Sequence, residues 1–193
     1  LNMADMGLKV LLVEKDYSIG GKMIHLSKVF PTLDCSACIA TPKISETVRH
    51  PNITIFTFSE VSDILKNGNS FHASVLKKTR YVDEEACTGC QDCEDVCPVV
   101  VPDEYQYGLV GRKAAFVPFS LASPRVAAID IDNCTLCGAC EKKCPASAID
   151  FTMKPVTVKI EAKAVIIATG FNIFNPEDMP RYNYHTSENV IHA

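Results

Sequence analysis

The sequence predicts an α/β fold whose main domain is interrupted by a smaller, cysteine-rich module of the α+β class. Short runs of branched apolar residues near both ends are typical of buried parallel strands. Between them, the stretch 81–110 holds eight acidic residues and no Lys or Arg. Eight of the ten cysteines lie in two blocks with the same internal spacing. We therefore expect the main domain at residues 1–79 and 152–193, with the cysteine module at residues 80–151 between its two parts.

The composition excludes several classes of protein. Of the 193 residues, 47% are hydrophobic and 22% are charged, which is typical of a globular chain rather than a disordered or fibrous one. A net charge of -4 offers no basic surface for nucleic acid. The apolar runs are far shorter than the roughly 18 to 20 residues that span a bilayer. No secretory signal opens the chain, so we expect reduced, metal-loaded cysteines in the cytoplasm.

The first segment indicates a nucleotide-binding unit. Residues 8–14 have the composition of a buried parallel strand that ends on Glu14, and residues 1–6 resemble the end of a helix stopped by Gly7. In a dinucleotide-binding βαβ unit, the acid that ends the second strand accepts hydrogen bonds from the adenosine ribose. Glu14 takes that place, unless it only ends a surface-facing strand. The first strand and its glycine-rich loop should precede residue 1, so we interpret the chain as a fragment.

Further strands are expected on both sides of the cysteine module. The Gly20-Gly21 pair either allows close backbone approach to a ligand or simply forms a turn. Residues 52–58 and 71–77 are predicted to form a small antiparallel pair around the turn-forming residues 66–69. Residues 156–160 and 164–170 predict two more strands, the second of them buried and ending in a glycine turn.

The two cysteine blocks share the spacing C-x₂-C-x₂-C-x₃-C-P, from Cys87 to Pro98 and from Cys134 to Pro145. This is the run of bacterial two-cluster ferredoxins, in which three thiolates hold one [4Fe-4S] cluster and the fourth ligates the other cluster. Structural zinc and disulfides fit the pattern poorly. The spacing therefore assigns Cys87, Cys90, Cys93 and Cys144 to one cluster, and Cys134, Cys137, Cys140 and Cys97 to the second.

A thiolate at every third position lets a loop wrap three corners of a cubic cluster and point backbone N–H groups at the sulfurs. Gly89 and Gly138 make this wrapping easier. The fourth cysteine of each block is expected to open a short helix near the other cluster. Two neighbouring clusters form a route for single electrons but perform no substrate chemistry, so no catalytic residue is identified.

The remaining cysteines, Cys35 and Cys38, form a separate C-x₂-C pair. Three hypotheses apply to this pair: a redox-active disulfide, half of a cluster site that is completed from elsewhere, or two small core residues.

Several segments match the motifs of one family: residues 12–15, 20–23, 30–39, 80–83, 111–114 and 168–170, together with both cysteine blocks. In these segments the chain resembles the A subunit of heterodisulfide reductase and the related quinone-interacting oxidoreductase flavoproteins. The resemblance implies a Rossmann-like, thioredoxin-reductase-like FAD domain, interrupted by a two-cluster ferredoxin insertion, within a larger electron-transfer complex. It also implies FAD contacts at Glu14, Gly20, Gly21, Lys22, Thr169 and Gly170, although the family's glycine-rich loop is absent from the chain.

The leading hypothesis is therefore an oxidoreductase subunit that relays electrons between FAD and two [4Fe-4S] clusters to partner subunits. A fragment of this kind is expected to be inactive alone. The alternative hypothesis is a ferredoxin-like wiring and docking module that binds no flavin.

Overall fold

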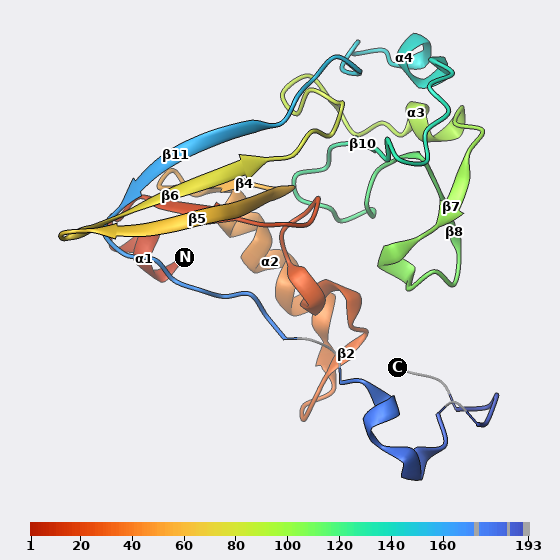
Figure 1. Ribbon diagram of the computed structural model, residues 1–193, viewed down its shortest axis with the longest axis horizontal. Helices are drawn as coiled ribbons and strands as arrows, with labels where there is room; N and C mark the ends of the chain where they lie inside the picture. Colours follow the sequence, from red (N-terminus) through yellow and green to blue (C-terminus); the bar gives the residue numbers. More distant parts are fainter. Residues whose placement is uncertain (172–173, 185, 191–193) are drawn as a thin grey trace.

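The computed structural model describes residues 1–171, 174–184 and 186–190, and it is mixed α/β as predicted. Figure 1 shows two regions, with the long strands and helix α2 on one side and the segment that contains α3, α4, β7, β8 and β10 on the other. The chain enters the second region after β6 and returns to the first in β11. This arrangement matches an insertion between two parts of one sheet.

The first region begins with a parallel strand pair. The short helix α1 (Asn2–Asp5) precedes β1 (Val10–Val13), and β4 (Ile53–Phe56) runs parallel beside β1. The 14-residue helix α2 (Ser36–Arg49) leads into β4 and packs against it. The helix and the parallel strand expected at the start of the chain are confirmed. β1 is half-buried rather than fully buried, because β4 is its only neighbouring strand among the described residues.

Between β1 and α2 the chain forms a short 3₁₀ helix and a small hairpin. η1 (Gly21–His25) packs against α2, and β2 (Lys28–Val29) pairs with β3 (Asp34–Cys35). This connection carries the predicted Gly20-Gly21 turn and ends at the C-x₂-C pair.

A three-stranded antiparallel sheet joins the two parts of the first region. Its central strand, β6 (Ser70–Lys77), pairs with β5 (Ser59–Asn67) on one side and with β11 (Val156–Ala162) on the other. The turn expected at residues 66–69 is confirmed, but the strand pairing predicted around it was wrong. β4 pairs with β1. β6 pairs with β11 and with β5, and β5 is the strand that the sequence did not predict. β5 is mostly polar and exposed, so it lacks the apolar signal of a strand.

Residues 164–170 form no strand, which contradicts the prediction. The segment is exposed throughout, with Ile166 at 67% and Ile167 at 80% exposure. Its composition is that of a buried strand, but no described strand lies beside it to accept its backbone hydrogen bonds. Two short turns follow, η3 (Pro176–Asp178) and η4 (Pro180–Tyr182).

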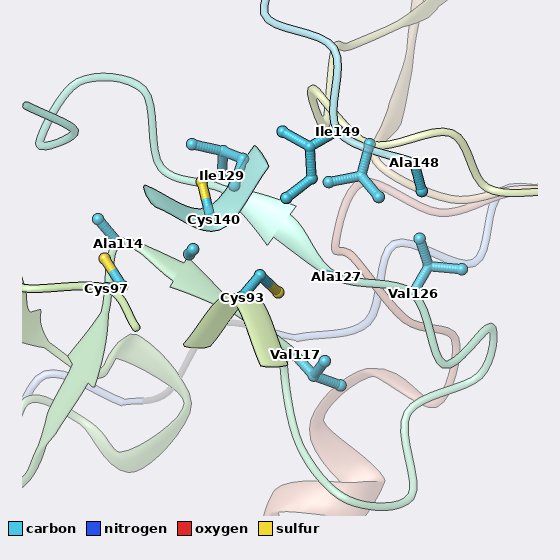
Figure 2. Close-up of a cluster of buried hydrophobic side chains, with 12 residues drawn as sticks. Cys93, Cys97, Ala114, Val117, Val126, Ala127, Ile129, Cys140, Ala148 and Ile149 are labelled. Atoms are coloured by element: carbon cyan, nitrogen blue, oxygen red, sulfur yellow. The ribbon is translucent and has the colours of Figure 1, made fainter. Parts of the chain in front are cut away.

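The second region is built from short elements around one core. In chain order these are α3 (Asp92–Asp95), β7 (Val100–Pro102), η2 (Glu104–Gln106), β8 (Gly111–Lys113), β9 (Ala115–Phe116), β10 (Ala128–Ile129) and α4 (Ala139–Lys143). β7 pairs with β8, β9 pairs with β10, and a bridge between Val82 and Ile149 closes the region near its two ends. Figure 2 shows Cys93, Cys97 and Cys140 among the buried apolar side chains of this core.

The two regions touch through the loop that follows β1. The Ser123 N–H donates to the Ser18 hydroxyl at 2.7 Å, and the Ile19 N–H donates to the Ser123 carbonyl at 3.0 Å. The Tyr17 ring stacks on Phe58 of the first region and meets the edge of Phe116 in the second. In the part of the chain that the structure describes, no helix is both long and apolar enough to cross a membrane.

Candidate functional site

The two cysteine loops repeat one backbone conformation. In the first block, Gly89 and Gln91 adopt left-handed φ values of 65° and 72°. The equivalent positions of the second block, Leu136 and Gly138, have φ values of 53° and 70°. Non-glycine residues rarely adopt this conformation, yet Gln91 and Leu136 do so at positions where the other block has a glycine. The two blocks are therefore two copies of one loop.

Backbone N–H groups point at the sulfurs of both loops. The Gly89 N–H lies 3.4 Å from Cys87 Sγ, and the Leu136 N–H lies 3.4 Å from Cys134 Sγ. The Ala148 N–H likewise donates to Cys144 Sγ at 3.4 Å. Donors of this kind stabilise thiolates and tune the potential of a cluster that they hold.

The short helices carry the third cysteine of each block, rather than beginning at the fourth as expected. Cys93 lies in α3 and Cys140 lies in α4, and the two helices pack against each other. Cys97 and Cys144 instead follow the ends of these helices, where Pro98 and Pro145 prevent the helix from continuing. Because α3 and α4 are in contact, the two cysteine blocks lie side by side.

The electrostatics of the buried thiols favour a bound cation. Burial, together with the neighbouring cysteines Cys87, Cys140 and Cys90, raises the pKa of Cys93 to about 12. The pKa of Cys140 is raised for the same reason, with Cys134 and Cys97 contributing. A thiol with so high a pKa stays protonated at neutral pH, so a bound metal is needed to hold it as thiolate. The eight cysteines of the two blocks are all free thiols.

Within the described ranges, no three His, Cys, Asp or Glu side chains surround one point as the ligands of a single metal ion would. The four cysteines of a cubic cluster bind four different iron atoms, so their sulfurs stand farther apart than the ligands of one ion. The free thiols, the N–H donors and the repeated loops together fit such a cluster.

Comparison with known proteins agrees with this chemistry. The family model described as "4Fe-4S dicluster domain" matches residues 83–148. The chain is 49% identical over 191 residues to an iron-sulfur A subunit of CoB–CoM heterodisulfide reductase from Methanopyrus kandleri. It is 44% identical over 191 residues to the iron-sulfur A subunit from Methanocaldococcus jannaschii. It is also 42% identical over 192 residues to the A subunit of a ferredoxin:CoB–CoM heterodisulfide reductase from Methanosarcina mazei.

The chain is homologous to part of the A subunit of heterodisulfide reductase. The resemblance drawn from the sequence motifs is thereby confirmed. Each match covers 99% of the chain, but the chain spans only 29% of the Methanopyrus and Methanocaldococcus proteins and 24% of the Methanosarcina protein.

The structure brings together two of the segments expected to contact FAD. Lys22 donates a hydrogen bond from Nζ to the Phe171 carbonyl at 2.6 Å, and its ammonium group lies 5.1 Å from the centre of the Phe171 ring. The segment that ends in Thr169 and Gly170 therefore lies beside the turn at Gly21, although some 150 residues separate them in sequence. Gly21 and Gly170 both have positive φ and open space beside Cα, whereas Gly20 packs against Ile24.

Glu14 lies just beyond the end of β1, as the nucleotide-binding hypothesis requires. Its side chain is half-buried, and burial raises the pKa of its carboxyl group. Oε1 accepts a hydrogen bond from the Asp16 N–H at 3.1 Å. The carboxylate therefore shapes the loop that leads to Tyr17 and Ser18.

Cys35 and Cys38 are joined by a disulfide at the start of α2, with a Cα–Cα distance of 5.2 Å. Cys35 is the N-cap residue of the helix, and its sulfur accepts the Cys38 N–H at 3.2 Å. Both residues are exposed, so the hypothesis of two small core residues is wrong.

Arg80 belongs to the motif segment 80–83, but the sequence analysis gave it no role of its own. Its side chain is buried at the point where the chain enters the second region, with only 3% of the residue exposed. The available signal was its position as the last basic residue before the acidic stretch 81–110.

The Gly89→Ala substitution is expected to prevent assembly of the first cluster. A Cβ atom at residue 89 would lie 2.5 Å from the Arg125 carbonyl oxygen, so the loop would have to move. The conformation itself is not the obstacle, because Leu136 adopts it in the second block. Gly138→Ala is the matched control, since its Cβ would meet only a Glu141 oxygen at 3.9 Å. Iron analysis of the anaerobically purified protein should show about half of the iron lost in the first variant only. Equal iron in both variants would contradict this explanation.

Replacing both Cys35 and Cys38 with serine is expected to leave the iron content unchanged, because the two sulfurs are bonded to each other. Iron and acid-labile sulfide should stay at about eight each per chain, as two [4Fe-4S] clusters require. A loss of iron in this double variant would support the ligand hypothesis for the pair instead.

Proposed function

We propose that the chain is the electron-transfer part of a heterodisulfide-reductase-like oxidoreductase, and that its two cysteine blocks hold two [4Fe-4S] clusters. The observation that carries the proposal is the duplicated loop, in which matching backbone turns direct an N–H group at the first cysteine sulfur of each block. Clusters held by such loops exchange one electron at a time and leave substrate chemistry to other parts of the protein.

The surroundings of the buried thiols support a pair of clusters in which each takes its fourth cysteine ligand from the other block. Cys97 of the first block contributes to the raised pKa of Cys140, and Cys140 contributes to that of Cys93, so the two blocks lie close together. With the blocks adjacent, the ferredoxin spacing assigns one cluster to Cys134, Cys137, Cys140 and Cys97. The other cluster is then assigned to Cys87, Cys90, Cys93 and Cys144, with Cys144 Sγ held by the Ala148 N–H.

The first region supports a flavin site in the full-length protein. In the described chain, no atom beyond the immediate chain neighbours lies within 4 Å of the position that a Cβ would take at Gly21 or Gly170, so a ligand can approach the backbone there. The hydrogen bond from Lys22 joins the two segments. Glu14 stands at the end of β1, where an acid accepts hydrogen bonds from an adenosine ribose. These residues would hold FAD, which exchanges electrons in pairs or singly and so connects a two-electron donor with one-electron carriers.

The proposed setting is a multi-subunit complex in a reducing compartment such as the cytoplasm. The relatives are named as A subunits, which implies partner subunits for those proteins. Eight free cysteines in a chain with a single disulfide agree with a reducing environment. The alternative function, a wiring module without flavin, is favoured by the exposed state of residues 164–170.

Paired serine variants test whether each cluster takes its fourth cysteine ligand from the other block. Cys144→Ser is expected to change the same cluster signal in the EPR spectrum as Cys90→Ser, although Cys144 belongs to the other block. Cys97→Ser should change the same signal as Cys137→Ser, for the same reason. The spectra are recorded on dithionite-reduced full-length protein, with iron content measured in parallel. If Cys144→Ser instead matches Cys137→Ser, each block binds its own cluster and the proposed assignment is wrong.

Flavin content separates the leading function from the alternative. The full-length protein, purified without oxygen, is expected to show a flavin spectrum as well as about eight iron atoms. Lys22→Met should weaken flavin binding by about fivefold, because it removes one charge-assisted hydrogen bond between the two segments. Lys28→Met, which alters an exposed lysine of β2, is the matched control. Full iron without any flavin in the unmodified protein would establish the wiring module.

A further inference from the structure

The guanidinium group of Arg80 is buried where the two regions meet, and it binds to both of them. Its Nη2 donates to the Tyr17 carbonyl at 2.7 Å and to the hydroxyl of Thr57, both in the first region. Its Nε donates to Glu84 Oε1 at 2.8 Å, at the start of the second region. The Arg80 side chain is only 2% exposed.

One nitrogen of this group is left over. Nη1 of Arg80 is fully buried and has no hydrogen-bond partner among the described residues. An unpaired, charged donor inside a protein carries a large free-energy cost, so a further hydrogen-bond acceptor is expected to complete the site. The only other buried polar side-chain atom left unpaired in the described part of the chain is Oγ1 of its neighbour Thr79.

The nearest part of the proposed cluster site is Cys87. Burial lowers the pKa of Arg80, while the Glu84 carboxylate, through its charge and its hydrogen bond, opposes that change, with smaller contributions from Tyr17 and Cys87. Cys87 therefore lies within range of the guanidinium charge. Its backbone N–H donates to the Asp83 carbonyl at 3.0 Å, which keeps the cysteine loop against the segment that carries Arg80.

We propose that Arg80 raises the reduction potential of the cluster held by Cys87 through the positive charge of its buried guanidinium group. The proposal rests on the cluster assignment made above. A [4Fe-4S] cluster with four thiolates is anionic, and reduction adds a further negative charge. A buried positive charge nearby stabilises the reduced form more than the oxidised form, so the potential rises.

The acidic partner of Arg80 does not cancel this effect. The Glu84 side chain is 39% exposed, whereas that of Arg80 is 2% exposed. Water therefore screens the carboxylate much more than the guanidinium group, and the field inside the site remains positive. Asp83 and Glu85 are exposed as well, and Tyr17 contributes only its ring face and its carbonyl group.

The test is a redox titration of the full-length protein, followed by EPR. Arg80→Gln is expected to lower the reduced-to-oxidised ratio of one cluster about tenfold at a fixed potential, which equals a shift of about 59 mV for a one-electron couple. The affected signal should be the one that disappears in Cys90→Ser. Arg125→Gln is the matched control, because Arg125 is exposed and hydrogen-bonds Gln91 of the same loop at 3.2 Å. Its shift should stay below about twofold.

Two further variants separate the charge of Arg80 from its structural contacts. Arg80→Lys keeps the charge and should retain most of the potential. Glu84→Gln removes the opposing charge and should shift the same cluster in the upward direction. These two variants decide the question if Arg80→Gln does not assemble.

A normal potential in iron-replete Arg80→Gln protein would overturn the proposal. So would an equal loss in Arg80→Lys, or a downward shift in Glu84→Gln. An unmodified protein without clusters would instead overturn the proposed function, so the two failures can be told apart.

Discussion

A buried thiolate must be matched by positive charge and by hydrogen-bond donors, and this requirement explains most features of the second region. Cys93 and Cys140 lie in its core, where water cannot stabilise a negative sulfur. The loops supply such donors, because their left-handed turns direct N–H groups at the sulfurs of Cys87 and Cys134. The core of this region is small and made of residues such as Ala114 and Ile129, so the proposed clusters would add to the contacts that hold it together.

The same requirement explains how the two regions are joined. Tyr17, Ser18 and Ile19 follow β1 and contact the second region directly, so the end of the parallel strand pair is tied to the cysteine module. Arg80 binds the Tyr17 carbonyl from the other side. The loop that follows Glu14 therefore contacts both the proposed cofactor side and the cluster side, which is the arrangement that electron transfer between them needs.

The sequence predicted what depends on local chemistry. The turn around Gly68 and the parallel strand β1 follow from neighbouring residues, and the structure confirms both. Features that depend on distant partners were missed. β5 has too few buried side chains to signal a strand, and residues 164–170 are apolar but lie without a neighbouring strand in the described chain. The placement of Lys22 beside Phe171 likewise depends on the tertiary fold, and the sequence did not predict this contact.

The two cysteine loops are alike in backbone conformation but differ in their surroundings. Loops of the same shape therefore need not hold clusters of the same reduction potential. Gly89 is required because the Arg125 backbone presses against it, whereas Leu136 takes the same turn in open space. Arg80 is buried near the first loop with one nitrogen unpaired among the described residues, whereas Arg112, which lies near the second loop, is bound by Asp130 and Glu104, and Lys142 and Lys143 are exposed on α4. Solvent weakens their effect on a nearby sulfur, while burial preserves that of Arg80. Under the role proposed for Arg80, two loops of the same shape would hold clusters of unequal potential, and an electron would pass toward the cluster of the first loop.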